Sequence, residues 1–255
     1  METKVITYLN NKGGVLKTTL ATNHAVYLAQ QGYKVLIIDT DAQNNVAETF
    51  YLPKAKYSIW DIMFNDISYQ QTIISKNTID FITSSIELSQ FDETLLSLME
   101  QKKKFKLSNE IIDEIISSKK YDYIIIDTSP NLSNLLYYTL LGSQYLIIPF
   151  NPDFSSISGL TNVINFINNA KKENHKLEIL SLVPTITNAR SEIEEDLIFQ
   201  LKDHFKLLPI SQHRIKNSQS PRRYVLMYNQ PILGYKKYAS YKSVLTNYFK
   251  SLKIK

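Results

Sequence analysis

The sequence predicts an α/β fold in which a doubly wound, mostly parallel sheet is flanked by helices. Six short segments are continuously apolar instead of alternating, as expected for parallel strands that are covered on both faces. Segments of helical length separate them, and this alternation of strand and helix is typical of a doubly wound sheet. The 255 residues contain no internal repeat, low-complexity run or linker, so we expect a single domain over residues 1–255.

The expected elements follow one another along most of the chain. The strands are Lys4–Leu9, Lys34–Asp39, Ile79–Thr83, Tyr121–Asp127, Tyr145–Pro149 and Leu177–Val183. The helices are Thr18–Gln31, Ile86–Met99, Ser108–Ser118, Ser133–Leu141, Ser155–Lys171 and Ser191–His204. Gly32 directly follows the first helix, in the position where glycine commonly ends a helix.

The composition excludes several classes of site. The chain has no cysteine, which excludes disulfides, zinc–thiolate sites, iron–sulfur clusters and cysteine nucleophiles. It begins without the cationic start and apolar stretch of a signal peptide. No apolar run approaches the roughly 20 residues that a membrane-spanning helix needs. We therefore expect a cytoplasmic protein with no stable membrane insertion.

Basic residues concentrate toward the end of the chain. The net charge is +5, but residues 201–255 contain twelve Lys and Arg residues and one acidic residue, and so carry +11. The arginines of the chain are Arg190, Arg214, Arg222 and Arg223. Arginine forms bidentate contacts with phosphate and carboxylate groups, so this region is a candidate surface for an anionic partner. The alternative is a lysine-rich face that is simply solvated.

The stretch NNKGGVLKTTL, from Asn10 to Leu20, lies between the first strand and the first helix. It departs from the phosphate-loop pattern G-x-x-x-x-G-K-[ST] because both outer glycines are missing. In this position the backbone N–H groups of Gly13 to Thr18 can surround a phosphate at the positive end of the helix. Lys17 would reach the β- and γ-phosphates, and the Thr18 hydroxyl would bind Mg²⁺. The alternative is a Gly-Gly turn that matches by chance.

Two further strands end in carboxylates. Asp39 and Asp41 end the second strand in the segment DTDAQN, and Asp127 ends the strand in YIIIDTSP. The carboxyl ends of parallel strands meet at the crevice where ligands bind. Asp39 and Asp41 suit positioning of Mg²⁺ and of an attacking water, and Asp127 suits the water shell of the metal. An ordinary acidic turn is the alternative for the first pair. The loop and both strand ends, in this order, predict a nucleoside triphosphate site.

Together these segments resemble the deviant Walker A family of ParA, Soj and MinD. The matching segments are Lys12–Thr19 (KGGVLKTT), Asp39–Asn44 (DTDAQN), Asp127–Leu132 (DTSPNL), Ile147–Pro149 followed by Ser158–Leu160, and Thr185–Arg190 (TITNAR). The match runs in the family's order from residue 4 to about residue 250, and it favours the partition branch of ParA and Soj over the MinD branch. The resemblance implies a P-loop ATPase fold that binds ATP and Mg²⁺.

The resemblance also implies catalytic roles. Lys12 would reach across an ATP-bound homodimer to the phosphates held by the partner, and Lys17 would neutralise charge on the phosphates of its own chain. Asp41 would orient the attacking water. The metal-binding residues would be Thr18, Asp39 and Asp127.

The implied nucleotide site includes the loop and two positions far along the chain. Its residues are Lys12, Gly13, Gly14, Val15, Leu16, Lys17, Thr18, Thr19, Asn188 and Pro209. Asn188 would read the adenine, and Pro209 would lie near the position where the base stacks. Leu16 departs from the family, which has glycine there because the backbone comes close to the β-phosphate. A leucine is compatible with the site if its φ is negative and its side chain points away. The alternative is that it weakens or alters nucleotide binding.

The basic region gains a role from the resemblance as well, since partition ATPases bind DNA non-specifically as ATP dimers. The implied DNA-binding residues are Arg190, Arg214, Lys216, Arg222 and Arg223. Such contacts go to phosphates and weaken steeply with salt. The resemblance further implies a ParB-type centromere-binding partner that stimulates hydrolysis, and association with the nucleoid. Because the first strand begins at residue 4, we expect no N-terminal helix-turn-helix domain.

Two alternative functions stay open. The segment Tyr248–Lys255 (YFKSLKIK) is weakly amphipathic, which would suit a membrane-surface ATPase like MinD. Leu16 would suit a nucleotide switch that hydrolyses ATP slowly or not at all.

Overall fold

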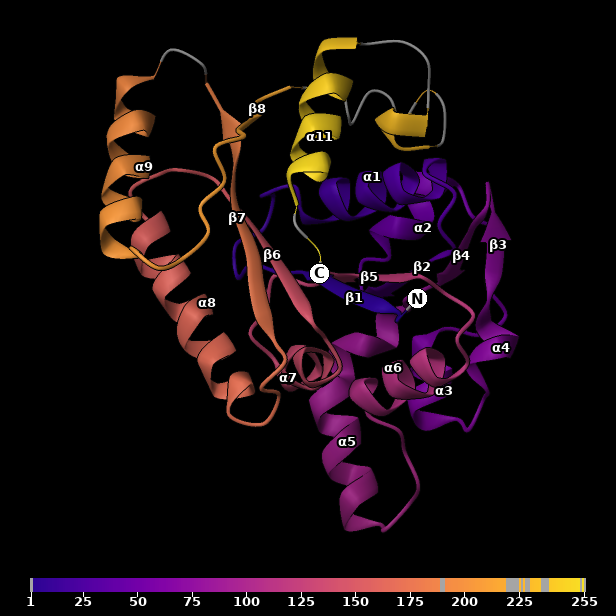
Figure 1. Cartoon of the computed structure of the whole chain (residues 1–255). Helices are drawn as coiled ribbons and strands as arrows, with labels where there is room; N and C mark the ends of the chain where they lie inside the picture. The colour runs from indigo at the N-terminus through magenta and orange to yellow at the C-terminus, as the bar shows by residue number, and fades with distance from the viewer. Residues whose placement is uncertain are drawn as a thin grey trace.

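The structure is a computed structural model that describes residues 2–188, 191–218, 225, 227, 230–234, 239–252 and 254. Among these residues, eight strands form one sheet in the order β3-β4-β2-β5-β1-β6-β7-β8 (Figure 1). The strands are β1 Lys4–Tyr8, β2 Val35–Thr40, β3 Ile74–Lys76, β4 Ile79–Ile82, β5 Tyr123–Thr128, β6 Tyr145–Phe150, β7 Glu178–Thr187 and β8 Ile215–Lys216. Neighbouring strands are parallel except β3 and β4, which confirms the mostly parallel sheet.

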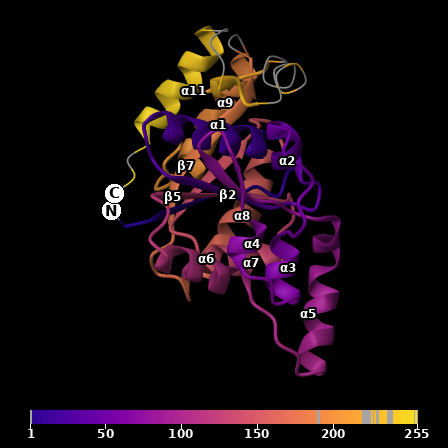
Figure 2. The ribbon, with the colours of Figure 1, turned by 90° about the vertical axis from the view of Figure 1, so that its right-hand side faces the viewer.

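Helices cover both faces of this sheet. They are α1 Lys17–Gln30, α2 Asn45–Phe50, α3 Ile59–Phe64, α4 Tyr69–Thr72, α5 Phe91–Glu100, α6 Ser108–Ser117, α7 Asn134–Leu141, α8 Ser156–Lys171, α9 Glu192–His204 and α11 Ala239–Ser251. Two 3₁₀ segments, Ile86–Gln90 and Ile232–Gly234, precede α5 and α11. Figures 1 and 2 show α1 and α11 on one face of the sheet and α3 and α6 on the other.

Strand β1 shows why the central strands are continuously apolar. Successive side chains of a strand point to opposite faces, so both faces of β1 need an apolar surface. Ile6 and Tyr8 are buried in the cluster that contains residues of α1 and α11. Val5 is buried in the opposite cluster with residues of α3 and α6. The same alternation in β2 and β5 places the middle of the sheet between two apolar layers.

The six predicted strands and the six predicted helical segments are all present, and the differences lie at short elements. The sequence analysis missed β3, β8, α2, α3, α4 and α11. Strand β3 has three partly exposed residues, so it lacks the apolar run by which the other strands were recognised. It joins β4 through Asn77 and Thr78, which both have positive φ angles, 50° and 66°. The predicted helix over residues 86–99 begins as the 3₁₀ segment, and β7 continues beyond Val183 to Thr187.

Helix α1 is joined to α11 through a buried histidine. The Tyr8 hydroxyl lies 2.8 Å from Nδ1 of His24, and the His24 ring stacks on Phe249 with centroids 4.6 Å apart. Burial lowers the pKa of His24 to about 3, so the ring is neutral in the folded chain at neutral pH. This contact fixes α1, whose first turn carries the loop residues, against the C-terminal helix.

We expect His24 to make the protein less stable in mild acid. The pKa of His24 is about 3 in the folded chain, against an ordinary value of 6.5, so only the unfolded chain binds this proton between those values. The stability is therefore complete above pH 6.5 and is lost as the pH falls toward 3, by at most about 1.4 kcal/mol per pH unit from this group. Urea unfolding at pH 7, 6 and 5 measures the slope. His24→Phe keeps the stacking and removes the proton site, so its slope should be smaller; equal slopes would contradict the assignment.

Candidate functional site

The loop between β1 and α1 is held by two neighbouring strands. The Asn10 side chain donates to the Pro149 carbonyl oxygen at 2.6 Å and accepts from the Lys12 backbone N–H at 3.0 Å. The Thr185 hydroxyl lies 3.1 Å from the carbonyl oxygens of both Val15 and Phe150. Residues at the carboxyl ends of β6 and β7 therefore fix both halves of the loop. The sequence analysis gave no role to Asn10 or to the Thr185 side chain.

Leu16 occupies the N-cap position of α1 in the left-handed conformation. Its φ and ψ angles are 68° and 27°, and its carbonyl oxygen accepts the first helical hydrogen bond, from Leu20 N–H at 2.9 Å. We expected a leucine to be compatible with the site if its φ is negative. The φ of Leu16 is positive, so this condition is not met. The half-buried side chain packs against the apolar cluster of α1, and it also lines a groove beside the loop. A left-handed non-glycine residue stores about 1–2 kcal/mol of backbone strain.

This groove, which we call the loop groove, has a volume of about 330 Å³. The predicted residues that line it are Gly13, Gly14, Leu16, Lys17, Thr18, Thr19 and Asp41, and Gln43, Asn45 and Pro130 join them. The loop, the end of β2 and the end of β5 thus meet around one opening at the N-terminus of α1. Backbone N–H groups at a helix N-terminus attract anions, so the groove suits a phosphate group.

Lys17 and Thr18 begin α1 and approach the strand-end carboxylates. The Thr18 hydroxyl donates to Asp127 at 2.6 Å. The Lys17 side chain is buried, and its ammonium group donates to the Lys12 carbonyl oxygen at 3.3 Å. Burial lowers the pKa of Lys17, although Asp127 and Asp41 favour the charged form. A buried ammonium group beside the loop can interact strongly with an anion that enters the groove.

Asp39 and Asp127 lie directly opposite each other because β2 and β5 pair in register. Burial raises the pKa of Asp127 to about 7 and that of Asp39 well above its ordinary value. Asp39 accepts the backbone N–H groups of Asp41 and Val46, at 2.9 and 3.1 Å. The second oxygen of Asp127, Oδ1, is buried and has no hydrogen-bond partner among the described residues. Two buried carboxyl groups, one of them with an unpartnered oxygen, suit a cation that offsets their charge.

The chemistry of these oxygens fits Mg²⁺ that is also bound by phosphate and water. Carboxylate and hydroxyl oxygens are hard ligands, and Mg²⁺ usually binds one or two of them while keeping several waters. Within the described part of the chain, no three His, Cys, Asp or Glu side chains are grouped closely enough to hold a metal ion by themselves. The site therefore fits a magnesium–nucleotide complex better than a metal ion alone.

Asp41 faces the loop groove from the end of β2. It is buried, and its Oδ1 accepts the Gln43 backbone N–H at 3.1 Å. Its own carbonyl oxygen accepts from Ser84 and, at 2.9 Å, from Asn44 N–H. These contacts fix the backbone of the segment that carries the Asp41 carboxylate. The position suits a group that orients a water molecule beside a bound phosphate.

Lys12 is paired within its own chain. Its ammonium group forms an ion pair with Asp153 and lies 3.4 Å from the Ser155 hydroxyl oxygen. Burial alone would raise the pKa of Asp153, but hydrogen bonds from Lys12 and Ser155 hold it below the ordinary value. The sequence analysis missed Asp153, although it lies just after β6, where the other strand-end signals occur.

The two predicted nucleotide-binding residues that lie far along the chain have partners outside the loop. Asn188 follows β7, and its backbone and side-chain N–H groups both donate to Glu194, at 2.9 and 3.2 Å. Pro209 accepts the Leu182 N–H at 2.9 Å and lines a separate groove with Glu178 and other residues in the first half of β7. The structure therefore does not bring Pro209 to the loop, because it lies beside the middle of β7 and not at its carboxyl end.

The predicted DNA-binding residues are only partly described. Arg190, Arg222 and Arg223 lie outside the described residues. Lys216 is exposed on β8, as expected for a phosphate contact. Arg214 forms an ion pair with Glu195 at 2.9 Å, on a helix whose first turn also carries Glu192 and Glu194. The charge of Arg214 is thus largely neutralised by its own chain.

Comparisons with known proteins identify relatives of this chain. A family model described as an AAA domain matches residues 3–179. A ParA family protein of Mycoplasma pneumoniae is 32% identical over 228 residues, which cover 82% of this chain and 81% of that protein. The sporulation initiation inhibitor protein Soj of Bacillus subtilis is 29% identical over 208 residues, 80% of each chain. A crystal structure of a putative plasmid partition protein of Borrelia burgdorferi bound to AMPPNP has a TM-score of 0.76 and 26% identity over 98% of both chains.

We expect Leu16→Gly to bind ATP more tightly than the natural chain. Glycine removes the side chain that lines the loop groove and accepts the left-handed conformation without strain. The lost packing of a half-buried leucine opposes this gain, so the free energy of unfolding should change by no more than about 1 kcal/mol. Calorimetry with Mg²⁺ should show at least about fivefold tighter ATP binding, with Leu16→Ala between the two. Equal or weaker binding by the glycine variant would mean that the leucine is tolerated and supports the loop.

Proposed function

Since this chain belongs to the ParA family, we propose that it is a partition ATPase of the ParA/Soj type. The observation that carries this proposal is the meeting of the loop with two strand-end carboxylates, in which Thr18 contacts Asp127 at 2.6 Å and Asp41 faces the same groove. The Borrelia burgdorferi relative was crystallised with AMPPNP, an ATP analogue, which supports ATP as the nucleotide.

The loop and the two strand ends would hold ATP together with Mg²⁺. Backbone N–H groups from Gly13 to Thr18 would surround the phosphates at the N-terminus of α1. Lys17 would offset the charge of the β- and γ-phosphates. Thr18 and Asp127 would hold the magnesium ion, with Asp39 supporting Asp127. Bound Mg²⁺ would supply charge stabilisation for the transferred phosphoryl group.

Asp41 would orient the water that attacks the γ-phosphate. Its carboxylate lines the loop groove, and its backbone is fixed by Ser84 and Asn44. A fixed backbone keeps this carboxylate at one position, which favours orientation of the water over random approach. Breakage of the bond between the β–γ bridging oxygen and the γ-phosphorus then yields ADP and phosphate.

Lys12 would change partners when two ATP-bound chains associate. In the single chain it is neutralised by Asp153. In an ATP-bound homodimer we propose that it leaves Asp153 and contacts the phosphates bound by the other chain. A partly exposed ion pair is worth only about 0–1 kcal/mol, so a bound triphosphate can readily compete with Asp153 for the ammonium group.

The ATP dimer would bind DNA non-specifically and respond to a ParB-type partner. Lys216, Arg190, Arg222 and Arg223 are the proposed phosphate contacts, and Arg214 would contribute only after it separates from Glu195. A partner bound at a centromere site would stimulate hydrolysis and release the protein from DNA. We place the protein in the cytoplasm, on the nucleoid, with a plasmid or a chromosome as its cargo.

A membrane-surface role like that of MinD would need free apolar side chains near the end of the chain. The apolar side chains of α11, namely Tyr241, Leu245, Tyr248 and Phe249, are buried against the core. Leu252 and Ile254 pack against the same cluster, so the segment has no free apolar face among its described residues. Among the described helices, none has the length and apolar character needed to cross a bilayer.

We expect Asp41→Ala to bind ATP but to lose turnover. Removing a group that orients the attacking water lowers kcat by roughly 10²–10⁴-fold, whereas the phosphate contacts of Lys17 and the loop stay in place. Phosphate release with Mg²⁺-ATP, measured beside ATP affinity, separates the two effects. Glu100→Gln, an exposed acidic position at the end of α5, is the control and should keep full turnover. Unchanged turnover by the Asp41 variant would contradict the assigned role.

DNA binding should depend on ATP and fall with salt. Each phosphate contact adds about 0.9 to the slope of log affinity against log salt, so Lys216→Ala should reduce this slope by about one contact. Glu195→Gln frees Arg214 and should tighten binding. Titration of a labelled duplex of arbitrary sequence at several salt concentrations measures both. A slope that neither variant changes would place the DNA surface elsewhere.

A further inference from the structure

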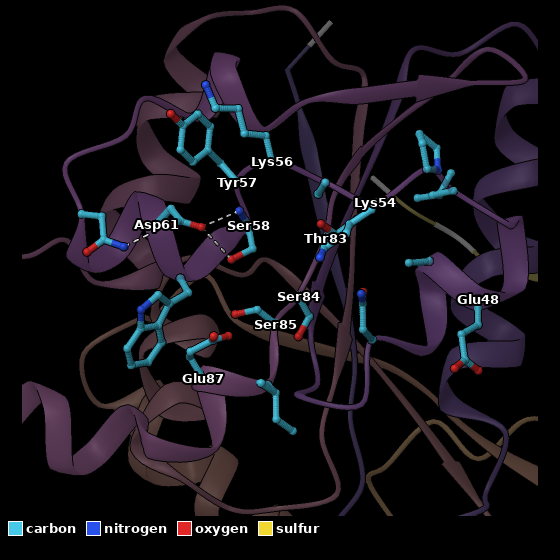
Figure 3. Close-up of a pocket in the computed structure, with 18 of the residues that line it drawn as sticks. Glu48, Lys54, Lys56, Tyr57, Ser58, Asp61, Thr83, Ser84, Ser85 and Glu87 are labelled. Carbon is cyan, nitrogen blue, oxygen red and sulfur yellow. Dashed lines mark hydrogen bonds between the residues drawn. The ribbon is translucent and has the colours of Figure 1, made fainter.

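A second groove lies beside the loop groove and has no part in the proposed ATPase site. It has a volume of about 830 Å³ and is formed by α2, the connection over residues 51–58, α3 and residues 83–87 after β4 (Figure 3). We call it the α2–α3 groove. Its volume exceeds the 330 Å³ of the loop groove, and four separate segments border it. An opening of this volume is large enough for a small molecule or for a short length of chain.

The floor of the α2–α3 groove contains buried oxygens that lack partners. Thr83 is 2% exposed, and its hydroxyl has no hydrogen-bond partner among the described residues. The Ser85 hydroxyl and the Asn44 side-chain oxygen are buried and unpartnered in the same part of the chain. A buried hydroxyl without a partner destabilises a fold, and valine has nearly the same shape as threonine without that penalty. Unpaired polar groups that persist at one opening point to a ligand that pairs with them.

The floor is also connected to the segment that carries Asp41. Residues 83–85 are not helical, and Ser85 has extended φ and ψ angles of −146° and 161°. The Ser84 hydroxyl donates to the carbonyl oxygen of Asp41, and Asn44 N–H donates to the same oxygen at 2.9 Å. Ser84, which contacts Asp41, lies between Thr83 and Ser85 in the chain. A molecule that pairs with Thr83 and Ser85 would therefore bind the residues on both sides of Ser84.

The rim of the groove combines apolar surface with an unpaired cation. Tyr51 and Ile86, which both line it, are 69% and 63% exposed. Exposed large apolar side chains around a groove are typical of protein contacts. Figure 3 shows Lys54 directed toward Thr83, and Lys54 forms no ion pair with any described residue. The ammonium group of Lys54 and the hydroxyls of Thr83 and Ser85 together offer donors that need an acceptor.

Three acidic residues line the groove and limit what can occupy it: Asp61, which accepts hydrogen bonds from Ser58 and Asn65, and Glu48 and Glu87. Figure 3 shows Glu48 and Glu87 at opposite sides of the opening. They would repel nucleic acid or a densely acidic segment, both of which present negative charge along their whole length. A single carboxylate at the middle, next to Lys54, avoids both residues.

We propose that the α2–α3 groove binds an extended segment of a partner protein, which places one carboxylate side chain against Lys54, Thr83 and Ser85. Apolar side chains on either side of that carboxylate cover Tyr51 and Ile86. Binding at this groove does not require the loop to bind nucleotide, so the site stands apart from the proposed ATPase function.

Three pools of labelled nine-residue peptides test the groove. Each pool has a central Glu, Gln or Lys between two apolar residues and random residues elsewhere. Fluorescence polarisation with the full chain, without nucleotide, should show at least about tenfold tighter binding of the Glu pool, which corresponds to about 1.4 kcal/mol. Thr83→Val and Lys54→Gln should each remove most of this preference. Lys202→Gln is the matched control, since Lys202 is an exposed lysine on α9, outside the groove, and this variant should bind as the natural chain does. Equal binding of the three pools, or binding that Thr83→Val leaves intact, would overturn the proposal.

Thermal unfolding gives an independent readout of the unpartnered hydroxyl. Thr83→Val should raise the Tm of the free protein, because it removes an unpaired buried group without changing the packing. The Glu pool should raise the Tm of the natural chain but not that of the variant. Ser85→Ala, which removes the second unpartnered hydroxyl, should also abolish the rise in Tm that the Glu pool causes. A Tm that Thr83→Val lowers would mean that the hydroxyl is already satisfied in the free protein, and the proposal would fail. Self-association of the free chain that Thr83→Val abolishes would assign the groove to a second copy and would also overturn it.

Discussion

Burial of the sheet on both faces is the constraint on which the candidate site depends. Neighbouring parallel strands must be joined by a segment that crosses one face of the sheet, and the helices in these crossovers cover both faces. The carboxyl ends of β1, β2 and β5 then reach one edge of the sheet, where the β1–α1 loop also lies. The register between β2 and β5 then places Asp39 directly opposite Asp127. The two apolar layers thus determine where the polar chemistry gathers.

The same edge concentrates features that destabilise the free chain. Asp39 and Asp127 are fully buried carboxyl groups, Lys17 is a buried ammonium group, and Leu16 is held in a left-handed conformation. Each of these features opposes folding by itself, and their clustering is typical of a site that a ligand completes. A magnesium–nucleotide complex would relieve several of them at once, because it brings both a cation for the carboxylates and an anion for the lysine. The loop region should therefore gain more stability from ATP than the distant sheet edges do.

Much of this site could be predicted because its residues follow local rules. Lys17, Thr18 and the strand-end aspartates stand at fixed positions relative to a strand or a helix, and periodicity locates those elements. The pairing of Lys12 with Asp153 joins residues 141 positions apart, and no local pattern encodes it. The neutralisation of Arg214 by Glu195 was missed for the same reason, since a count of charges does not say which of them touch. The sign of the Leu16 φ, on which its compatibility with the site was expected to depend, could not be predicted, because the helix start and the packing on the core override the residue's own preference. The α2–α3 groove could not be predicted for a different reason, because no sequence pattern indicates that a hydrogen-bond partner is missing.

The two ends of the sheet have a consequence for how copies of this chain can meet. Within the described part of the chain, the outer strands of the sheet are short, three residues in β3 and two in β8, and Lys76 of β3 donates to the carbonyl oxygens of Phe50 and Tyr51 at 2.6 and 2.9 Å. Short edges of this kind offer little template for adding a strand from another molecule. Growth of the sheet from chain to chain, which leads to fibres and aggregates, is therefore disfavoured at either end. Reversible association would then use helix and loop surfaces, where contacts form and break without the pairing of strands.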